Sequence, residues 1–281
     1  MASTLMNKIR YIISLARPVN VLITALSIGV AGLIAGIGDY HIQLLLAMCS
    51  AGLIAAAANS INDYFDIEID RINKPDRPLP AGHISANAGK QIALIEYAVG
   101  NSIAAIISPV ALAMALFFSA LTFLYASHFK RQPIWGNMVV SLSTAAAFIY
   151  GGVAVNSFRE TIYPATFAFF FHFGREIIKD MEDIEGDRAM GARTLPIVFG
   201  FSAAKRLIWL NFILLVLATL LPFYLQQYGI TYMIIVLIGV YPVLGYCLFS
   251  IQQNTSSKQL NFLSNLLKSD MVVGLLAVYF R

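Results

Sequence analysis

Charged residues are scarce in this sequence. Only 12% of its 281 residues are Asp, Glu, Lys or Arg, whereas a soluble globular domain averages about 25%. Hydrophobic residues make up 58% and gather in long runs from one end of the chain to the other. A soluble globular fold is therefore excluded, and the composition predicts an all-α polytopic membrane protein.

Cysteine is scarce too. The two cysteines, Cys49 and Cys247, both fall within apolar runs, which excludes a disulfide framework and a cysteine-rich zinc site. The first apolar run has the length of a full span, and no convincing small-residue cleavage site follows it. It therefore predicts a retained transmembrane helix rather than a signal peptide.

Nine apolar runs predict a bundle of nine transmembrane helices. Most of them carry no charge, and the last is the weakest because Asn265, Lys268 and Asp270 interrupt it. The predicted spans cover approximately residues 18–38, 42–62, 90–107, 109–127, 137–155, 162–179, 205–223, 230–250 and 261–280.

The basic residues are unevenly distributed. All of the 19 Lys and Arg residues except Arg159 and Arg281 lie at the N-terminus or around the predicted connections 2–3, 4–5, 6–7 and 8–9. The positive-inside rule places these regions in the cytoplasm, which predicts a multi-pass plasma-membrane protein with a cytoplasmic N-terminus. The same asymmetry accounts for the net charge of +4, so no nucleic-acid partner is expected.

Acids gather in two similar segments. Residues 62–80 read NDYFDIEIDRINKPDRPLP, and residues 179–196 read KDMEDIEGDRAMGARTLP. Both contain D-x-x-D-x-x-x-D followed by Arg, and both reach Arg-x-Leu-Pro soon afterwards. Each begins where an even-numbered span reaches the predicted cytoplasmic side. The pair indicates two half-repeats within a single domain that covers residues 1–281.

If the preceding helices continue through the acids, the three aspartates of each segment share one face, because positions i, i+3 and i+7 lie within roughly 60°. Glu68 and Glu185 point away from these faces. Clustered acids at a membrane boundary need cations, and oxygen ligands without His or Cys favour Mg²⁺ over zinc. The two faces comprise Asp63, Asp66 and Asp70, flanked by Asn62, and Asp180, Asp183 and Asp187.

Two Mg²⁺ ions are expected, and they would complete their coordination with water and phosphate oxygens. Nearby basic residues can neutralise the remaining phosphate charge, so the pattern is suited to binding diphosphate. A solvated surface at each helix end is the plainer alternative, but two copies at equivalent helix ends of an acid-poor chain favour a functional site. The basic candidates are Arg17, Arg71, Lys74, Arg77, Lys130, Arg131, Lys179, Arg188 and Arg193.

These segments resemble the motifs of the UbiA superfamily of intramembrane prenyltransferases. That family carries N-x-x-x-D-x-x-x-D after its second span and D-x-x-x-D after its sixth. The resemblance also covers ARPVN on the first span and a Tyr-x-x-x-Phe-Lys segment after the fourth. The matching residues here are Asn62, Asp66 and Asp70, then Tyr125, Phe129 and Lys130, and finally Asp183 and Asp187.

The resemblance implies a nine-helix fold with a central cavity, open toward the lipid and capped by cytoplasmic loops. It also implies an enzyme that binds an isoprenyl diphosphate through Mg²⁺, transfers the prenyl group to an acceptor and releases diphosphate. Catalysis then consists mainly of stabilising negative charge on the leaving group.

Roles for individual residues follow from this resemblance. One metal is assigned to Asn62, Asp66 and Asp70, and the other to Asp183 and Asp187. The catalytic set consists of these four aspartates together with Lys130, which is expected to contact diphosphate. The remaining candidates are Asp63 and Asp180, as outer or shared metal ligands, and Arg17, Arg71 and Arg77, as further diphosphate contacts.

The acceptor is suggested by residues 174–196, GREIIKDMEDIEGDRAMGARTLP. They most resemble the branch of the family that serves ether-lipid, and hence phospholipid, synthesis. That branch transfers a geranylgeranyl group from geranylgeranyl diphosphate to the free hydroxyl of geranylgeranylglyceryl phosphate. Arg175 and Lys179 are candidates to hold the acceptor phosphate, and positive-inside residues are the equal alternative.

Two other functions stay open. The chlorophyll-synthesising branch shares EGDR and a following Leu-Pro, so an aromatic or tetrapyrrole acceptor such as 4-hydroxybenzoate or chlorophyllide is the main alternative. A divalent-cation transporter is a remote one, because its charged ligands should lie near the bilayer midplane. Membrane lipids are expected partners, and the sequence makes no prediction of the oligomeric state.

Overall fold

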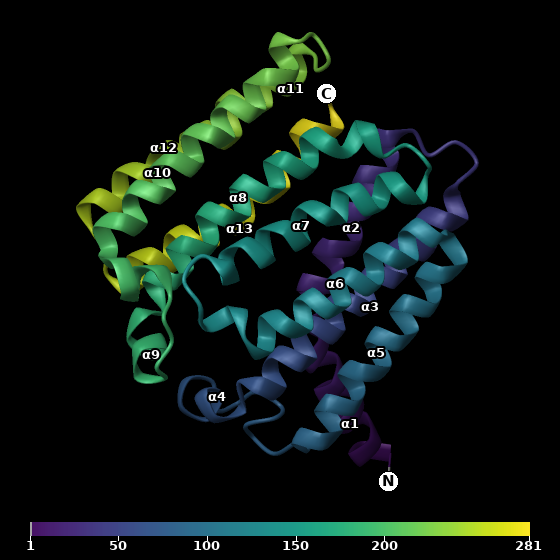
Figure 1. Cartoon of the computed structure of the whole chain (residues 1–281), viewed down its shortest axis with the longest axis vertical. Coiled ribbons are helices and arrows are strands. Elements are labelled where there is room, and N and C mark those ends of the chain that lie inside the picture. Colours follow the sequence, from purple (N-terminus) through teal and green to yellow (C-terminus); the bar gives the residue numbers. More distant parts are fainter. Residues whose placement is uncertain (1) are drawn as a thin grey trace. The chain divides into compact units, whose positions relative to one another are not determined.

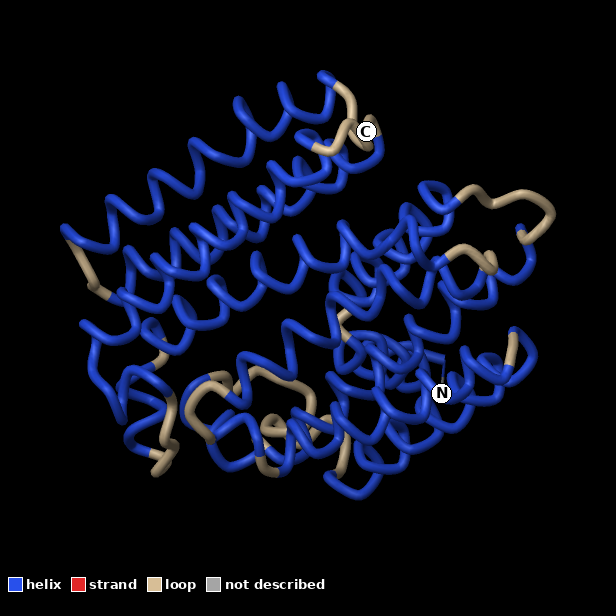
Figure 2. Tube along the Cα trace, turned by 45° about the horizontal axis from the view of Figure 1, so that its top comes forward, coloured by secondary structure: helices blue, strands red, loops and turns tan. Residues whose placement is uncertain are grey.

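The protein is helical throughout the part that the structure describes. A computed structural model describes the backbone of residues 2–281 and all side chains except those of residues 2–5, 7, 8, 72 and 73. Most helices are joined by short loops, a longer one covers residues 74–85, and no strand occurs between residues 2 and 281 (Figure 2). The prediction of an all-α protein is confirmed.

The chain forms two compact units, Met1–Phe129 with Tyr150–Arg159, and Lys130–Ile149 with Glu160–Arg281. Each contains one of the two acidic segments. The helices of the first unit (Figure 1) are α1 (Ala2–Ala16), α2 (Pro18–Ala35), α3 (His41–Phe65), α4 (Ile67–Asn73), α5 (Ala86–Ile107) and α6 (Pro109–Ser127), with the C-terminal end of α7 (Trp135–Ala154).

Helix α3 is the centre of the first unit and packs against α1, α2, α5 and α6. Small residues permit these close approaches. A Cβ atom on Gly100 would lie 3.0 Å from the backbone oxygen of Ser50. The Ser50 hydroxyl donates to the Gly100 carbonyl at 2.8 Å and lies 3.0 Å from the Tyr150 hydroxyl. Buried polar groups on three helices therefore satisfy one another inside an apolar bundle.

The second unit is built around α8. In Figure 1, α8, α10, α12 and α13 run alongside one another, and α8 packs directly against α10 and α13. A Cβ atom on Gly174 would lie 2.3 Å from a ring carbon of Phe212, so only glycine fits there. The helical segments are α8 (Ile162–Glu182), α9 (Ile184–Ala189), α10 (Leu195–Tyr224), α11 (Ile230–Ile235), the π-helical η3 (Val236–Val240), α12 (Tyr241–Gln253) and α13 (Ser257–Tyr279).

Seven helical stretches are long and apolar enough to cross a membrane, within the part of the chain that is described. They include Ser257–Tyr279, the last and weakest of the predicted spans. Helices α5 and α8 match the spans predicted at 90–107 and 162–179, but both carry charged residues and are not among the seven. The chain is an integral membrane protein, whereas the count of nine spans and the central cavity stay predictions.

Several predicted boundaries are wrong. The first span ends at Ala35 rather than 38, because Gly36 adopts a left-handed backbone with φ 87°. The span predicted to start at 205 belongs to a longer helix, Leu195–Tyr224, which is interrupted at Gly200 with φ 77°. The second helix runs past the predicted end of its span at 62 to Phe65 and includes Asp63, in line with the expectation that the helix continues into the acids. Glycine tolerates these positive φ values without strain. The predicted boundaries followed the apolar runs and took no account of Gly36 or Gly200.

A tight contact between α2 and the end of α7 gives a test of this packing. A Cβ atom on Gly151 would lie 2.6 Å from the carbonyl oxygen of Ile28. We expect Gly151→Ala to push the helices apart and to cost about 1–3 kcal/mol of stability, measured as a lower melting temperature in detergent. Gly245→Ala is the control, because no atom lies within 4 Å of its Cβ position, and its stability should change by less than about 1 kcal/mol. Equal melting temperatures would contradict the packing.

Candidate functional site

The first acidic segment begins inside α3 and ends in α4. Helix α3 stops at Phe65, and Asp66 adopts φ −97° and ψ 5° before α4 resumes at Ile67. Hydrogen bonds of helical spacing nevertheless run through the junction, from the Asp66 N–H to the Asn62 carbonyl at 3.0 Å and from the Asp70 N–H to the Asp66 carbonyl at 2.8 Å. The expected continuous helix is therefore bent at the second aspartate.

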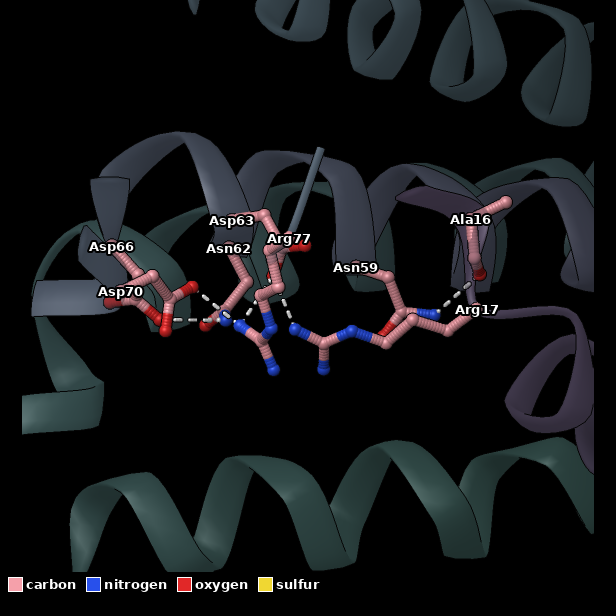
Figure 3. A network of polar contacts seen from close by, with 8 residues as sticks. All are labelled: Ala16, Arg17, Asn59, Asn62, Asp63, Asp66, Asp70 and Arg77. Atoms are coloured by element: carbon pink, nitrogen blue, oxygen red, sulfur yellow. Dashed lines mark hydrogen bonds and ion pairs between the residues drawn. The ribbon is translucent and has the colours of Figure 1, made fainter. Parts of the chain in front are cut away.

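Arginine side chains pair with two of the three aspartates of this segment, Asp63 and Asp70 (Figure 3). Arg77 donates to Asp70 Oδ2 at 2.5 Å and to Asp63 Oδ1 at 3.1 Å. Arg17 pairs with the same oxygen of Asp63. The Asn62 amide donates to Asp66 Oδ2 at 2.9 Å. Asn62 and all three predicted aspartates of the first segment thus lie close together, bonded in two groups: Asn62 with Asp66, and Arg17 and Arg77 with Asp63 and Asp70 (Figure 3).

Burial makes these ion pairs necessary. Asp63, Asp66 and Asp70 are exposed by only 2%, 5% and 5%. A carboxylate removed from water without a partner is strongly disfavoured, and neighbouring carboxylates add mutual repulsion. The guanidinium of Arg77 offsets both costs because its planar fork reaches two carboxylates at once.

The Arg-x-Leu-Pro motif explains how Arg77 is positioned. Leu79 is 5% exposed and packs in a small core with Leu15 and Ile84. Its side chain packs against Gly89: a Cβ atom on Gly89 would lie 2.7 Å from Leu79 Cδ2. Leucine therefore anchors the loop after α4, and the arginine two residues earlier is held beside the acids.

Arg17 is held by an unusual backbone. It lies between α1 and α2 in the left-handed region, with φ 54° and ψ 72°, which is unfavourable for a side chain with a Cβ atom. Pro18 begins α2 directly afterwards, and the Asn59 amide donates to the Ala16 carbonyl at 3.0 Å. These contacts hold the bend that directs Arg17 toward Asp63 (Figure 3).

The second acidic segment bends at the equivalent residue. Helix α8 ends at Glu182, Asp183 adopts φ −87° and ψ 6°, and α9 begins at Ile184. Asp180 accepts a hydrogen bond from the amide of Asn137 on α7 at 2.8 Å. Asn137 is 4% exposed and was not predicted. The sequence signal that could have indicated Asn137 is its position as an isolated amide at the start of the apolar run 137–155.

The carboxylates of the second segment are more accessible than those of the first. Asp183 is exposed, and its side chain has no hydrogen bond or ion pair to another described residue. Asp187 is partly buried, and the Ala192 N–H donates to its backbone carbonyl at 2.9 Å. Glu68 and Glu185 are both exposed, as their predicted orientation requires.

The other predicted basic residues are found in different surroundings. Arg71 pairs with exposed Glu68 at 2.8 Å. Arg175 pairs with Glu176 at 2.7 Å and donates to the Ser264 carbonyl at 3.2 Å, which ties α8 to α13. Lys179 is exposed. Lys130 is partly buried in the short helix Phe129–Arg131. Substrate-binding roles for these residues stay predictions.

The donor atoms suit a hard divalent cation. Asn62, Asp66 and Asp70 present amide and carboxylate oxygens close together, and such oxygens are the ligands that Mg²⁺ prefers. As the described side chains stand, no three His, Cys, Asp or Glu residues converge as a ready-made metal site. In the first segment, Asp70, which is one of the predicted metal ligands, forms an ion pair with Arg77.

Comparison with known proteins assigns the fold and the chemistry. The UbiA prenyltransferase family matches residues 21–267. The chain belongs to the UbiA prenyltransferase family. It is therefore a prenyltransferase, as the two acidic motifs predicted. The acidic segments described above are the two motifs by which the sequence resembles the UbiA family.

Individual relatives match between three quarters and nearly all of the chain. Digeranylgeranylglyceryl phosphate synthase of Methanopyrus kandleri is 35% identical over 268 residues, covering 95% of this chain and 97% of the relative. The synthase of Pyrococcus abyssi is 41% identical over 217 residues, covering 76% and 78%. A solved structure described as digeranylgeranylglyceryl phosphate synthase in membranes has a TM-score of 0.82 at 31% identity and covers 97% of both chains. A UbiA homolog from Archaeoglobus fulgidus bound to GPP and Mg²⁺ has a TM-score of 0.72 at 20% identity, covering 95% and 99%.

The ion pairs of this UbiA-family site give a matched pair of variants. Arg77→Gln leaves two buried carboxylates short of a cation, and since Arg77 is itself 23% exposed we expect a loss of roughly 2–4 kcal/mol. Arg71→Gln removes only an exposed ion pair and should cost less than about 1 kcal/mol. Thermal unfolding of both purified variants measures the difference. Equal losses would show that the Arg77 network does not stabilise the fold.

Proposed function

We propose that this UbiA-family enzyme transfers a geranylgeranyl group from geranylgeranyl diphosphate to the free hydroxyl of geranylgeranylglyceryl phosphate, in Mg²⁺-dependent ether-lipid synthesis. The observation that carries the choice of acceptor is the similarity to digeranylgeranylglyceryl phosphate synthases over 95% of the chain at 35% identity. The resemblance of residues 174–196 to the same branch points in the same direction.

The reaction breaks the bond between C1 of the prenyl chain and its diphosphate oxygen. The electron pair leaves with diphosphate, and the acceptor hydroxyl oxygen forms a new ether bond to C1. The hydroxyl proton passes to water or to the departing diphosphate. Because the carbon centre becomes cationic while the leaving group gains charge, the enzyme accelerates the reaction mainly by stabilising diphosphate.

The proposal assigns both acidic segments to this one reaction. Bound Mg²⁺ supplies Lewis-acid stabilisation of the leaving oxygens. Two ions are proposed, one on Asn62, Asp66 and Asp70 and the other on Asp183 and Asp187. Arg77 and Arg17 are cations that already lie beside the first segment and can pair with diphosphate oxygens. Lys130 and Arg71 are proposed as further diphosphate contacts, and Arg175 and Lys179 as contacts of the acceptor phosphate.

The first aspartate of each segment has a different proposed role from the other two. Asp63 pairs with Arg17 and Arg77, and Asp180 accepts a hydrogen bond from Asn137. Asp70 is also paired with Arg77, so the distinction rests on position: Asp63 and Asp180 lie outside the N-x-x-x-D-x-x-x-D and D-x-x-x-D motifs, beside the proposed direct ligands, which they can orient from the outer shell. This supports Asp63 and Asp180 as outer ligands.

The proposed enzyme is a plasma-membrane protein of nine spans, with its N-terminus and active-site loops in the cytoplasm. The support is the distribution of Lys and Arg together with the positive-inside rule. Both acidic segments follow apolar helices and precede basic loops, so each belongs to the same proposed side. We treat residues 1–281 as one catalytic domain because the family match runs from residue 21 to residue 267.

Product formation by the purified chain tests this function. With geranylgeranyl diphosphate, geranylgeranylglyceryl phosphate and Mg²⁺, we expect the double-chain ether lipid and one diphosphate per product. Chelation of Mg²⁺ should abolish the reaction, because charge on the leaving group is then not neutralised. Parallel assays with 4-hydroxybenzoate and chlorophyllide test the alternative acceptors. Product with either of these, and none with the lipid, would overturn the proposed acceptor.

Matched acidic variants test whether both segments act in the reaction. Asp66→Asn and Asp183→Asn should each lower kcat/KM by about 10²–10³-fold, because each removes stabilisation of the leaving group. The controls are Glu68→Gln and Glu185→Gln, which alter exposed acids two residues further on in each segment. Full activity of either aspartate variant would remove that segment from the mechanism.

Asn137 is expected to be a positioning residue through its bond to Asp180. Asn137→Ala should raise the Mg²⁺ concentration for half-maximal activity by about tenfold, as is typical when an outer-shell partner is lost. Ser141→Ala is the control, because its hydroxyl bonds only to the Asn137 carbonyl of the same helix, at 2.6 Å. An unchanged Mg²⁺ requirement in Asn137→Ala would contradict this role.

A further inference from the structure

A groove on the second unit is lined by none of the acidic residues assigned above. It has a volume of about 550 Å³ and is open at the surface. Helix α10 supplies most of its walls, and α12, which packs against α10, supplies the remainder. The lining residues are Ser202, Lys205, Arg206, Trp209 and Gln252.

The two helices that line the groove present positive charge and contain no acid. Neither Lys205 nor Arg206 makes a hydrogen bond or an ion pair with another described side chain, and neither α10 nor α12 contains Asp or Glu. Two cations with open hydrogen-bonding capacity attract an anion, and an arginine fork matches phosphate oxygens particularly well. The hydroxyl of Ser202, the indole N–H of Trp209 and the amide of Gln252 add further donors.

The surface below the groove is apolar. Trp209 is 42% exposed, Ile213 follows it one turn along α10 at 48% exposure, and Phe249 on α12 is 65% exposed one turn before Gln252. Tryptophan beside Lys and Arg is typical of a membrane–water interface. A ligand that fits both parts has an anionic head and a hydrocarbon body.

The groove lies at the end of α10 that follows the second acidic segment. Helix α9 precedes α10, and Gln252 lies at the end of α12, just before α13. The start of α13 is tied to the acidic segment by a hydrogen bond from Asn261 to Glu182 at 2.6 Å. The proposed cytoplasmic side of the membrane is therefore where this groove would meet lipid headgroups.

We propose that this groove binds the phosphate headgroup of an anionic phospholipid, with the hydrocarbon chains lying along Trp209, Ile213 and Phe249. Lys205 and Arg206 contact the phosphate oxygens, while Trp209 packs against the glycerol and the first carbons of the chains. None of the residues assigned to prenyl transfer lines this groove, so the proposal does not depend on that reaction.

Native mass spectrometry of the full chain, released from neutral detergent, measures this binding directly. Titration with dioctanoyl phosphatidylglycerol should show one tight site, at least about tenfold tighter than for dioctanoyl phosphatidylcholine. The double variant Lys205→Gln/Arg206→Gln should weaken phosphatidylglycerol binding by about tenfold or more, because two charges near the headgroup are lost. Trp209→Phe, which keeps an aromatic ring, should cause a smaller loss of about threefold.

The control is Arg10→Gln/Lys90→Gln, which removes two exposed charges of the first unit and should leave binding unchanged. Equal weakening in both double variants would reduce the effect to net charge and overturn the proposal. Inorganic phosphate that binds as tightly as phosphatidylglycerol would overturn the assignment to a lipid. Circular dichroism of each variant confirms that the helices are intact, and Trp209→Phe tests the groove even if the double variant does not fold.

Discussion

The pairing of buried aspartates with two arginines is the interaction on which the first acidic segment depends. Apolar helices bring Asp63, Asp66 and Asp70 out of water, and such carboxylates persist as a group only beside compensating cations. Arg77 and Arg17 provide that compensation for Asp63 and Asp70, and the Asn62 amide donates to Asp66. The left-handed backbone at Arg17 directs this side chain toward Asp63. Leu79 is anchored in a small core and holds Arg77 beside the acids.

The two acidic segments share the same backbone bend, but different side chains bind their aspartates. Both helices bend at the second aspartate, at Asp66 and Asp183, with nearly the same φ and ψ. In the first segment the leading aspartate is paired with arginines, whereas in the second it accepts a bond from a neutral amide, that of Asn137. The first segment is therefore largely neutralised within its own unit. The exposed carboxylate of Asp183 makes the second segment the more accessible one to an incoming cation.

Membrane insertion constrains the rest of the molecule. Large apolar side chains can face lipid, so helix contacts depend on small residues that permit close approach rather than on hydrophobic burial. Gly100, Gly151 and Gly174 each lie where a Cβ atom would come within about 3 Å of a facing helix. Charged residues inside the helices are few and need special surroundings: the Ser60 hydroxyl donates to Glu96 within α5 at 3.0 Å, and Asp270 lies buried within α13.

The helical class, most of the spans, the two acidic motifs and the family could all be read from the sequence. They depend on local composition and on the spacing of a few residues, which the linear order preserves. The bends at Asp66 and Asp183, the pairing of Arg77 with Asp63 and Asp70, and the contact of Asn137 with Asp180 could not. Each of these depends on which atoms meet after the chain folds, since a buried carboxylate is stabilised by whichever donor the neighbouring helix or loop presents. Motif spacing identifies the acids, but only packing selects their partners.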